Sequence, residues 1–282
     1  EKASKVMMPL LFILLLIIVV AACLLPDAGK GVEFLLKPDF GKVDRNVFLN
    51  ALGQSFYSMS IGMGCICTYA SYFSRQTNLF KTALQISIID LLVAVLAGLM
   101  IFPAAFSVGV SPDSGPSLIF ITLPNVFNQA FASLPVLGWI ISLLFYVLLS
   151  VAALTSLMSL HEVNTSFFYE ELKIDRKKGA TIVTVSCAII GAFCSLSLGA
   201  TDKLSFFGKA LFDWFDFVTG QIFLPLAGFL TCLFLGWYVP KQIVQDEFTN
   251  WGTLKGHLFG IYLFLIKFVC PVLIFLVFLN QF

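Results

Sequence analysis

A glycine-interrupted segment rich in hydroxyl groups is the part of the sequence whose residue types most clearly suggest chemistry. It covers residues 51–73, with Gly62 and Gly64 near its centre and Ser58 and Ser60 just before them. A glycine in a helix interior costs about 1 kcal/mol relative to alanine, and non-helical backbone at membrane depth survives only where it is buried or lines a cavity. The segment therefore predicts a membrane helix that unwinds to offer its backbone to a solute. Close helix packing through the glycines is the alternative interpretation.

A second candidate lies farther along the chain, where a carbonyl and two hydroxyls fall on one turn of an expected helix. The carbonyl of Ala152 would lie over the side chains of Thr155 and Ser156. Oxygen atoms arranged in this way form half of a cage for a small hard cation. A hydrogen bond from a hydroxyl back to the carbonyl is the alternative interpretation.

A carboxylate inside an apolar stretch is the third candidate. Asp90 lies in such a stretch, where an ionisable group must be paired, protonated or bound to a cation. A protonated carboxyl hydrogen-bonded to a neighbouring helix is the alternative. An intramembrane enzyme built on His161, Glu162 and Asp90 is disfavoured, because the sequence has no metal-ligand pair at helical spacing and no nucleophile elbow. We therefore do not expect an enzyme.

The composition is that of an integral membrane protein. Of the 282 residues, 59% are hydrophobic and 12% are charged, whereas a soluble domain is about a quarter charged. The apolar runs are as long as spanning helices, which excludes an outer-membrane barrel. The net charge of +1 gives no support for nucleic-acid binding. The seven cysteines all fall in apolar stretches, so we expect neither disulfides nor a metal cluster.

The elements that must position these residues are helices of about 20 residues each. We expect one all-α membrane domain over residues 1–282 with seven spans, the second of which contains the interrupted segment. Their expected bounds are 6–25, 47–73, 82–102, 136–172, 180–198, 211–238 and 254–279. Residues 103–135, which are rich in proline and partly apolar, are expected to form an extracellular loop with short helices.

The distribution of Lys and Arg predicts the orientation in a plasma membrane. More of them fall on the side of the first residue than on the other side, so the first residue is expected in the cytoplasm and the last outside. The sequence opens with Glu1 and shows no signal-peptide pattern. We interpret the chain as the carboxyl-terminal portion of a longer protein.

Several motifs resemble the neurotransmitter:sodium symporter family. The residues 53–64 with 68–72 resemble its broken sixth helix, and 154–156 with 170–172 resemble its eighth. The residues 102–106 and 122–129 resemble the loop between its seventh and eighth helices. The resemblance covers essentially the whole chain and implies helices five to eleven of the inverted-repeat symporter fold, with the first four helices absent.

The resemblance also implies a role for individual positions. Ser58 and Asp90 would belong to a first sodium site, and the Ala152 carbonyl, Thr155 and Ser156 to a second. Each site would be only partly supplied by this chain, because the missing helices carry the rest. The amino-acid pocket would be lined by Tyr57, Ser58, Ser60, Gly62, Met63, Ser156 and Leu160. Asp216 would serve the outer gate, and Glu170 with Tyr72 near it would serve the inner gate.

Two departures from the family pattern suggest what is transported and with which ions. Asp90 stands where many members have asparagine, and its carboxylate can replace the chloride that animal members require, so we expect no chloride requirement. Met63 stands where phenylalanine is common. A flexible thioether adapts to different apolar groups, which favours a hydrophobic or aromatic amino acid as substrate.

The resulting hypothesis is sodium-coupled amino-acid symport by alternating access, incomplete in this chain. We expect the chain to have the lipid bilayer and the missing amino-terminal helices as partners, and not to transport by itself. The alternative is an accessory or structural membrane subunit without its own transport activity.

Overall fold

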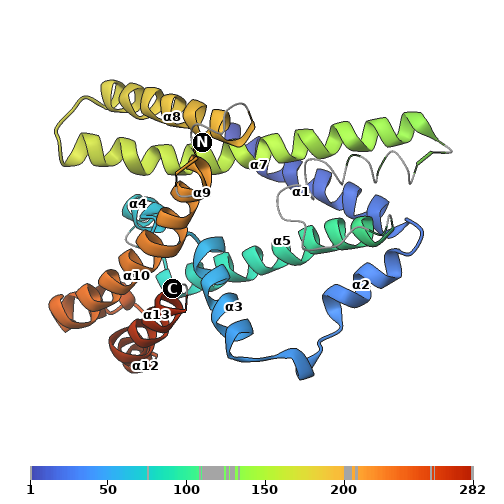
Figure 1. Cartoon of the computed structure of the whole chain (residues 1–282). Coiled ribbons are helices and arrows are strands. Elements are labelled where there is room, and N and C mark those ends of the chain that lie inside the picture. Colours follow the sequence, from blue (N-terminus) through green and yellow to red (C-terminus); the bar gives the residue numbers. More distant parts are fainter. Residues whose placement is uncertain are drawn as a thin grey trace. The chain divides into compact units, whose positions relative to one another are not determined.

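The computed structural model describes residues 2–74, 76–107, 109, 124, 127, 131–132, 134–199, 205–206, 209–254, 256 and 258–280. The short helices expected in the loop 103–135 lie for the most part outside these residues. The described regular elements are helices, apart from the strands β1 (Ser205–Phe206) and β2 (Lys209–Ala210), which pair antiparallel; turns and loops connect them. The all-helical prediction is therefore confirmed for the described residues (Figure 1).

The first half of the chain contains α1 (Lys2–Cys23), α2 (Ala28–Leu36), the 3₁₀ turn η1 (Phe40–Lys42), α3 (Arg45–Ser58), α4 (Cys65–Ser71) and α5 (Leu79–Ser107). The second half contains α7 (Pro135–Glu170), α8 (Arg176–Gly199), α9 (Leu211–Asp216), η4 (Phe217–Phe223), α10 (Leu224–Leu233), η5 (Phe234–Tyr238), α11 (Lys241–Phe248), α12 (Phe259–Phe264), η6 (Leu265–Val269) and α13 (Cys270–Leu279). The segments η4, η5 and η6 are π-helical turns within longer helices.

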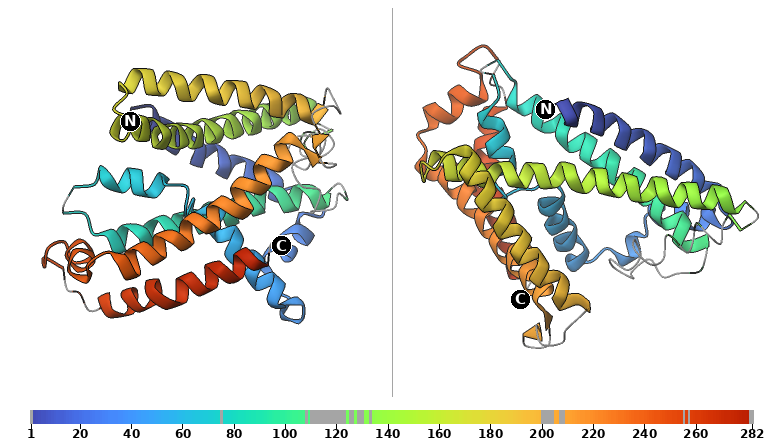
Figure 2. Two further views of the ribbon diagram at one scale, coloured as in Figure 1. Left: turned by 60° about the vertical axis from the view of Figure 1, so that its left-hand side comes forward. Right: turned by 90° about the horizontal axis from the view of Figure 1, so that it is seen from above.

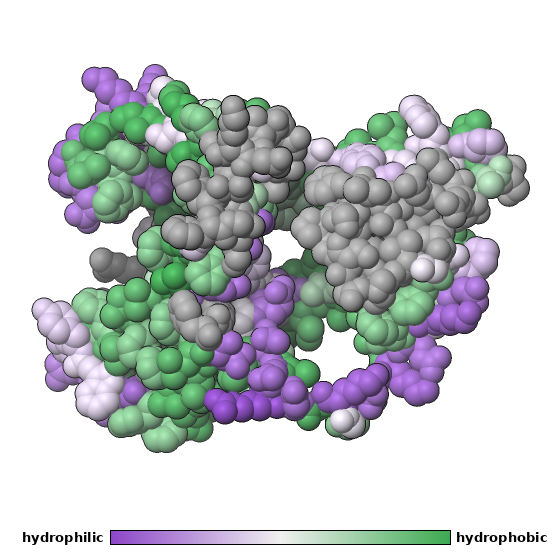
Figure 3. All heavy atoms as spheres, in the orientation of Figure 1, coloured by the Kyte–Doolittle hydropathy of each residue, from purple (hydrophilic) through white to green (hydrophobic). Residues whose placement is uncertain are grey.

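Among the residues that the structure describes, six helices are long and apolar enough to cross a membrane. They are Lys5–Cys23, Leu79–Ser107, Pro135–Glu170, Arg176–Ser197, Leu211–Tyr238 and Phe259–Leu279. The predicted second span, 47–73, is not among them, because it is divided between α3 and α4. Large apolar side chains are exposed along these helices. On the face that Figure 3 shows, green apolar residues cover much of the described surface, as expected where lipid replaces water.

Residue contacts divide the chain into two compact units, each of which is described by itself. The first unit combines residues 1–42 and 88–158, and the second combines 43–87 and 159–282. The helices α5 and α7 contribute to both units.

The core of the first unit is built from α1, α5 and α7. Ile18 and Ala22 of α1 and Ala104 of α5 are completely buried, and Phe145 of α7 is nearly so. Pro103 lies inside α5, although we expected the helix to end at residue 102. A proline has no N–H to bond the carbonyl four residues before it, and here the thiol of Cys23 lies 3.9 Å from that carbonyl, on Leu99.

The second unit joins two helix pairs. α10 and α13 are in contact and lie side by side in the left-hand view of Figure 2. α8 runs beside the carboxyl-terminal half of α7 (Figure 1). His161 links this pair, since its Nε2 lies 2.9 Å from the hydroxyl of Thr184 on α8 and its Nδ1 lies 3.2 Å from that of Thr165 on α7. The unit also contains the interrupted segment.

Candidate functional site

The interrupted segment is a break between two helices of the second unit. α3 ends at Ser58 and α4 begins at Cys65. Ser60, Gly62 and Gly64 all have positive φ, at 53°, 87° and 79°. Residues in the left-handed region cannot continue a right-handed helix, and glycine adopts this region without steric cost. Ser60 and Gly62 thus prevent α3 from continuing, and Gly64 is the residue that precedes α4.

The break is closed by a few local hydrogen bonds. The N–H of Ile61 donates to the carbonyl of Phe56 at 3.0 Å, and that of Met63 donates to Ser60 at 3.3 Å. Of the hydrogen bonds between described residues, none ends on the carbonyl oxygen of Ile61, Gly62 or Met63. Backbone polar groups that are removed from water require partners. These carbonyls are therefore available to a bound cation or polar solute.

Gly62 lies directly against the backbone of α10. A Cβ at this position would stand 2.5 Å from the carbonyl oxygen of Leu224 and 3.2 Å from the nitrogen of Gly228. Glycine is therefore required at position 62 for two reasons, its positive φ and this close approach. Gly64 faces the other way, since its Cβ would stand 3.3 Å from Val163 of α7.

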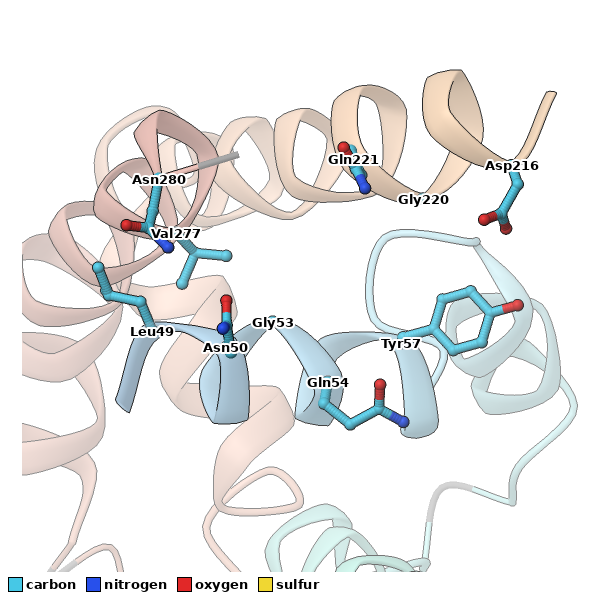
Figure 4. Close-up of a pocket in the computed structure, with 10 residues that line it drawn as sticks. All are labelled: Leu49, Asn50, Gly53, Gln54, Tyr57, Asp216, Gly220, Gln221, Val277 and Asn280. Carbon is cyan, nitrogen blue, oxygen red and sulfur yellow. The ribbon is translucent and has the colours of Figure 1, made fainter. Parts of the chain in front are cut away.

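A cavity of about 420 Å³ lies beside α3, within the second unit. Figure 4 shows Tyr57 and Asp216 at one end of this cavity and Leu49 and Val277 at the other. The structure therefore brings together two residues that were predicted separately, one for the substrate pocket and one for the outer gate. The cavity wall also contains four carboxamide side chains that the sequence analysis did not assign to the site: Asn50, Gln54, Gln221 and Asn280.

Two tyrosines connect the α4 segment, which we define as α4 together with the following residue Tyr72, to α7. The hydroxyl of Tyr69 donates to Ser159 at 2.8 Å, and that of Tyr72 donates to a carboxylate oxygen of Glu162 at 2.9 Å. Tyr72 also lies 3.1 Å from the hydroxyl of Ser166. Because α7 has 3.6 residues per turn, Glu162 and Ser166 share one face. Glu170, the expected neighbour of Tyr72, lies about two turns beyond Glu162 along α7, and the carboxylate that accepts from Tyr72 is that of Glu162.

Glu162 also forms an ion pair with Arg176, the first residue of α8. The side chain of Glu162 is 24% exposed and that of Arg176 is 60% exposed. Solvent therefore screens the ion pair and limits its contribution to stability. A single carboxylate thus joins the α4 segment, α7 and α8 through Tyr72, Ser166 and Arg176. Local sequence patterns do not predict these partners of Glu162, because they come together only through tertiary packing.

The residues expected to bind sodium lie on three helices. On α7 the Thr155 hydroxyl donates to the Ala152 carbonyl at 2.8 Å, and Ser156 follows on the same turn. Asp90 is half-buried on α5, in the first unit, whereas Ser58 ends α3, in the second. The proximity of Ser58 to Asp90 therefore stays a prediction. So does that of Ser156 to the pocket residues Tyr57, Ser60, Gly62 and Met63, since these belong to the second unit. Leu160 follows Ser156 by one turn on α7.

Comparison with known proteins gives matches along the whole chain. The sequence matches the sodium:neurotransmitter symporter family over residues 1–282. It is 35% identical over 281 residues to the sodium-dependent transporter YhdH of Bacillus subtilis, covering 99% of this chain and 61% of the relative. It is 34% identical over 283 residues to a sodium-dependent transporter of Haemophilus influenzae, covering 100% of this chain and 60% of the relative.

The fold matches a solved transporter at similar identity. The crystal structure of MhsT in complex with L-phenylalanine superposes with a TM-score of 0.85 at 36% identity, covering 99% of this chain and 62% of MhsT. The chain thus spans about three fifths of the length of the proteins it matches. The chain is a multi-pass membrane protein and belongs to the sodium:neurotransmitter symporter family.

Proposed function

We propose that the protein couples a sodium gradient to the transport of a hydrophobic or aromatic amino acid, and that this chain supplies part of the binding site. Membership of a family of sodium-dependent transporters supports the use of sodium. The activity of the whole protein is part of the proposal, since the chain spans about three fifths of its relatives.

The observation that carries the proposal is the break between α3 and α4. Its carbonyl oxygens at Ile61, Gly62 and Met63 accept no hydrogen bond from the described residues, and Gly62 is held against α10 by a contact that no other residue allows. Such a segment is pre-organised to bind a solute, because its backbone groups need not leave a helix first. We propose that α3, the break and α4 form one membrane crossing, the second of seven.

Two sodium sites are proposed around this break. Ser58 and Asp90 would contribute to the first, with the Asp90 carboxylate in place of a chloride ion. The carbonyl of Ala152 and the hydroxyls of Thr155 and Ser156 would contribute to the second. The hydrogen bond from Thr155 to Ala152 shows that these oxygens are close. A sodium ion there would require the Thr155 hydroxyl to turn its proton away from the carbonyl.

The substrate would lie against Tyr57, Ser60, Gly62, Met63, Ser156 and Leu160. The structural relative was solved with L-phenylalanine, and the flexible side chain of Met63 suits apolar groups of different shapes. Asp216 beside Tyr57 would gate the outer side (Figure 4). Tyr72 and Glu170 would gate the cytoplasmic side, and the hydrogen bond from Tyr72 to Glu162 supports adding Glu162 to this gate. The first residue of the chain would lie in the cytoplasm, in a plasma-membrane protein.

The experiment is sodium-dependent uptake of labelled phenylalanine into vesicles, with this chain joined to the amino-terminal part that its relatives have. Replacing both Thr155 and Ser156 by alanine should weaken the sodium dependence at least tenfold, about 1.4 kcal/mol. Ser150→Ala is the matched control, because Ser150 lies on the same helix, two residues before the proposed site, and its hydroxyl donates to the carbonyl of Tyr146. An unchanged sodium response in the double variant would contradict the proposed second site.

A further inference from the structure

Lys267 is a charged residue inside the candidate span Phe259–Leu279. Charged groups in a span are costly and are normally paired. Here the ammonium nitrogen lies over the ring of Trp237, 5.5 Å from its centroid, which is within the range of a cation–π interaction. Among the described residues, no carboxylate lies within ion-pair distance of Lys267. The ring of Trp237 carries no net charge, so no described residue neutralises the positive charge of Lys267.

Several contacts fix the lysine and the tryptophan together. The indole Nε1 of Trp237 donates to the backbone carbonyl of Lys267 at 3.3 Å. Gly236 is buried, and a Cβ there would stand 3.1 Å from Cγ and 3.3 Å from Cα of Lys267. A larger residue at 236 would separate the two helices, so the glycine allows the ring to reach the ammonium.

Both residues also occupy π-helical turns. Trp237 lies in η5 and Lys267 in η6, and these two turns contact each other. A π-helical turn inserted in an α-helix is less stable than the regular helix and is frequent at functional sites. The contact between two such turns, one on each helix, indicates that the helices are shaped locally to place Lys267 beside Trp237.

The position along the spans places this pair near a membrane boundary. Trp237 is one residue before the end of the span Leu211–Tyr238. Helical side chains point toward the amino terminus of their helix, so the long Lys267 side chain extends toward the boundary at which α12 begins, as snorkelling lysines do. Tryptophan is also enriched at this depth. The ammonium is therefore near the level of lipid headgroups.

The surroundings of the pair are apolar and exposed. The Trp237 residue is 61% exposed, and its ring packs edge-on against Phe268 at 5.6 Å between centroids. Phe268 in turn contacts the exposed Phe264 at 5.6 Å. In a membrane helix such a surface faces acyl chains. A ligand that contacts both the ammonium and the exposed aromatic rings must therefore combine an anionic phosphate group with a hydrocarbon chain.

We propose that the Lys267 ammonium, positioned by the ring of Trp237, binds the headgroup phosphate of an acidic phospholipid, with an acyl chain against Phe264 and Phe268. A lysine near a membrane surface contributes about 1 kcal/mol to binding of acidic lipid. This corresponds to a preference of about fivefold over a neutral lipid. The site is independent of the proposed sodium and substrate sites.

The test uses the protein with its amino-terminal part, reconstituted in nanodiscs of phosphatidylcholine with added phosphatidylglycerol. Native mass spectrometry measures how much of each lipid remains bound. Lys267→Met keeps the length of the side chain and removes the charge, so retention of phosphatidylglycerol should fall about fivefold toward that of phosphatidylcholine. Lys267→Arg should keep the preference. Lys241→Met, which removes an exposed charge on α11 outside the spans, is the matched control and should also keep it.

Two results would overturn the proposal. One is an unchanged preference for phosphatidylglycerol in Lys267→Met. The other is displacement of the lipid by inorganic phosphate, which would identify a soluble anion as the ligand. Should Lys267→Met fail to fold, Trp237→Leu retains the charge and removes the ring. It is then expected to lower retention as well, and wild-type retention in this variant would equally overturn the proposal.

Discussion

Gly62 shows how strongly one residue can be determined by its surroundings. Its φ of 87° lies in a region that disfavours any side chain, and its Cβ position is occupied by the Leu224 carbonyl oxygen at 2.5 Å. The sequence indicated that a helix is interrupted here. It did not indicate that the interruption is pressed against α10, because that contact joins residues far apart in the chain.

Replacing Gly62 by alanine should destabilise the protein and abolish substrate binding. The left-handed conformation alone costs an alanine roughly 1–2 kcal/mol, and the clash with a backbone atom adds to this. Thermal unfolding in detergent should show a lower midpoint temperature, and labelled phenylalanine should no longer bind to the protein in the presence of sodium. Gly191→Ala is the control: a Cβ there meets nothing within 4 Å on α8, so this variant should be neutral or slightly more stable. Normal binding by Gly62→Ala would mean that the break is not the binding site.

At the scale of elements, α4 is a short helix that depends on its neighbours. It has seven residues, and an isolated helix of that length is not stable in water. The two tyrosine hydroxyls at Tyr69 and Tyr72 attach this segment to α7. If substrate transport requires α4 to move, the bonds to Ser159 and Glu162 are those that must break.

Replacing Tyr72 by phenylalanine should therefore loosen α4 without unfolding the protein. The lost hydrogen bond to the Glu162 carboxylate contributes about 1 kcal/mol at such a partly exposed site. Hydrogen–deuterium exchange over residues 65–71 should become roughly fivefold faster. Tyr169→Phe, which removes an exposed hydroxyl from α7, serves as the control. Equal exchange in the two variants would show that the Tyr72 bond does not hold α4.

The bounds of several elements show where sequence patterns stop being informative. The last span was expected from residue 254, but α12 begins at Phe259 and a separate helix, α11, precedes it. Asn250, Trp251 and Gly252 have positive φ in succession, which no helix pattern predicts for the first two residues. Likewise α5 continues through Pro103 to Ser107, although the carbonyl of Leu99 receives no bond from the proline; the thiol of Cys23 lies 3.9 Å from that carbonyl.

At the scale of the whole molecule, the all-helical class and the family follow from composition and local motifs. Long apolar runs and the glycine–hydroxyl pattern around Ser58–Gly64 are local in sequence, so they can be interpreted without a structure. The role of Glu162 and the carboxamides around the cavity could not be predicted in the same way. Glu162 acquires Tyr72 and Arg176 as partners only when α4 and α8 pack against α7.

The chain by itself should not transport. It spans about three fifths of its relatives, and the proposed sodium and substrate sites need ligands beyond those of this chain. Residues 1–282 reconstituted alone in vesicles are expected to show no sodium-driven uptake of phenylalanine. The positive control is the same chain joined to the amino-terminal part that its relatives have, reconstituted in the same vesicles. Uptake by the chain alone would show that its own residues complete the site.

The central claim is that the backbone between Ser58 and Cys65 binds ion and substrate. Hydrogen–deuterium exchange of residues 59–67 measures this directly, in the protein with its amino-terminal part, with sodium and phenylalanine or with potassium alone. The account predicts that exchange of these amides slows at least tenfold when sodium and phenylalanine are both present, while the amides of α8 change little. Equal exchange of residues 59–67 under the two conditions would contradict it.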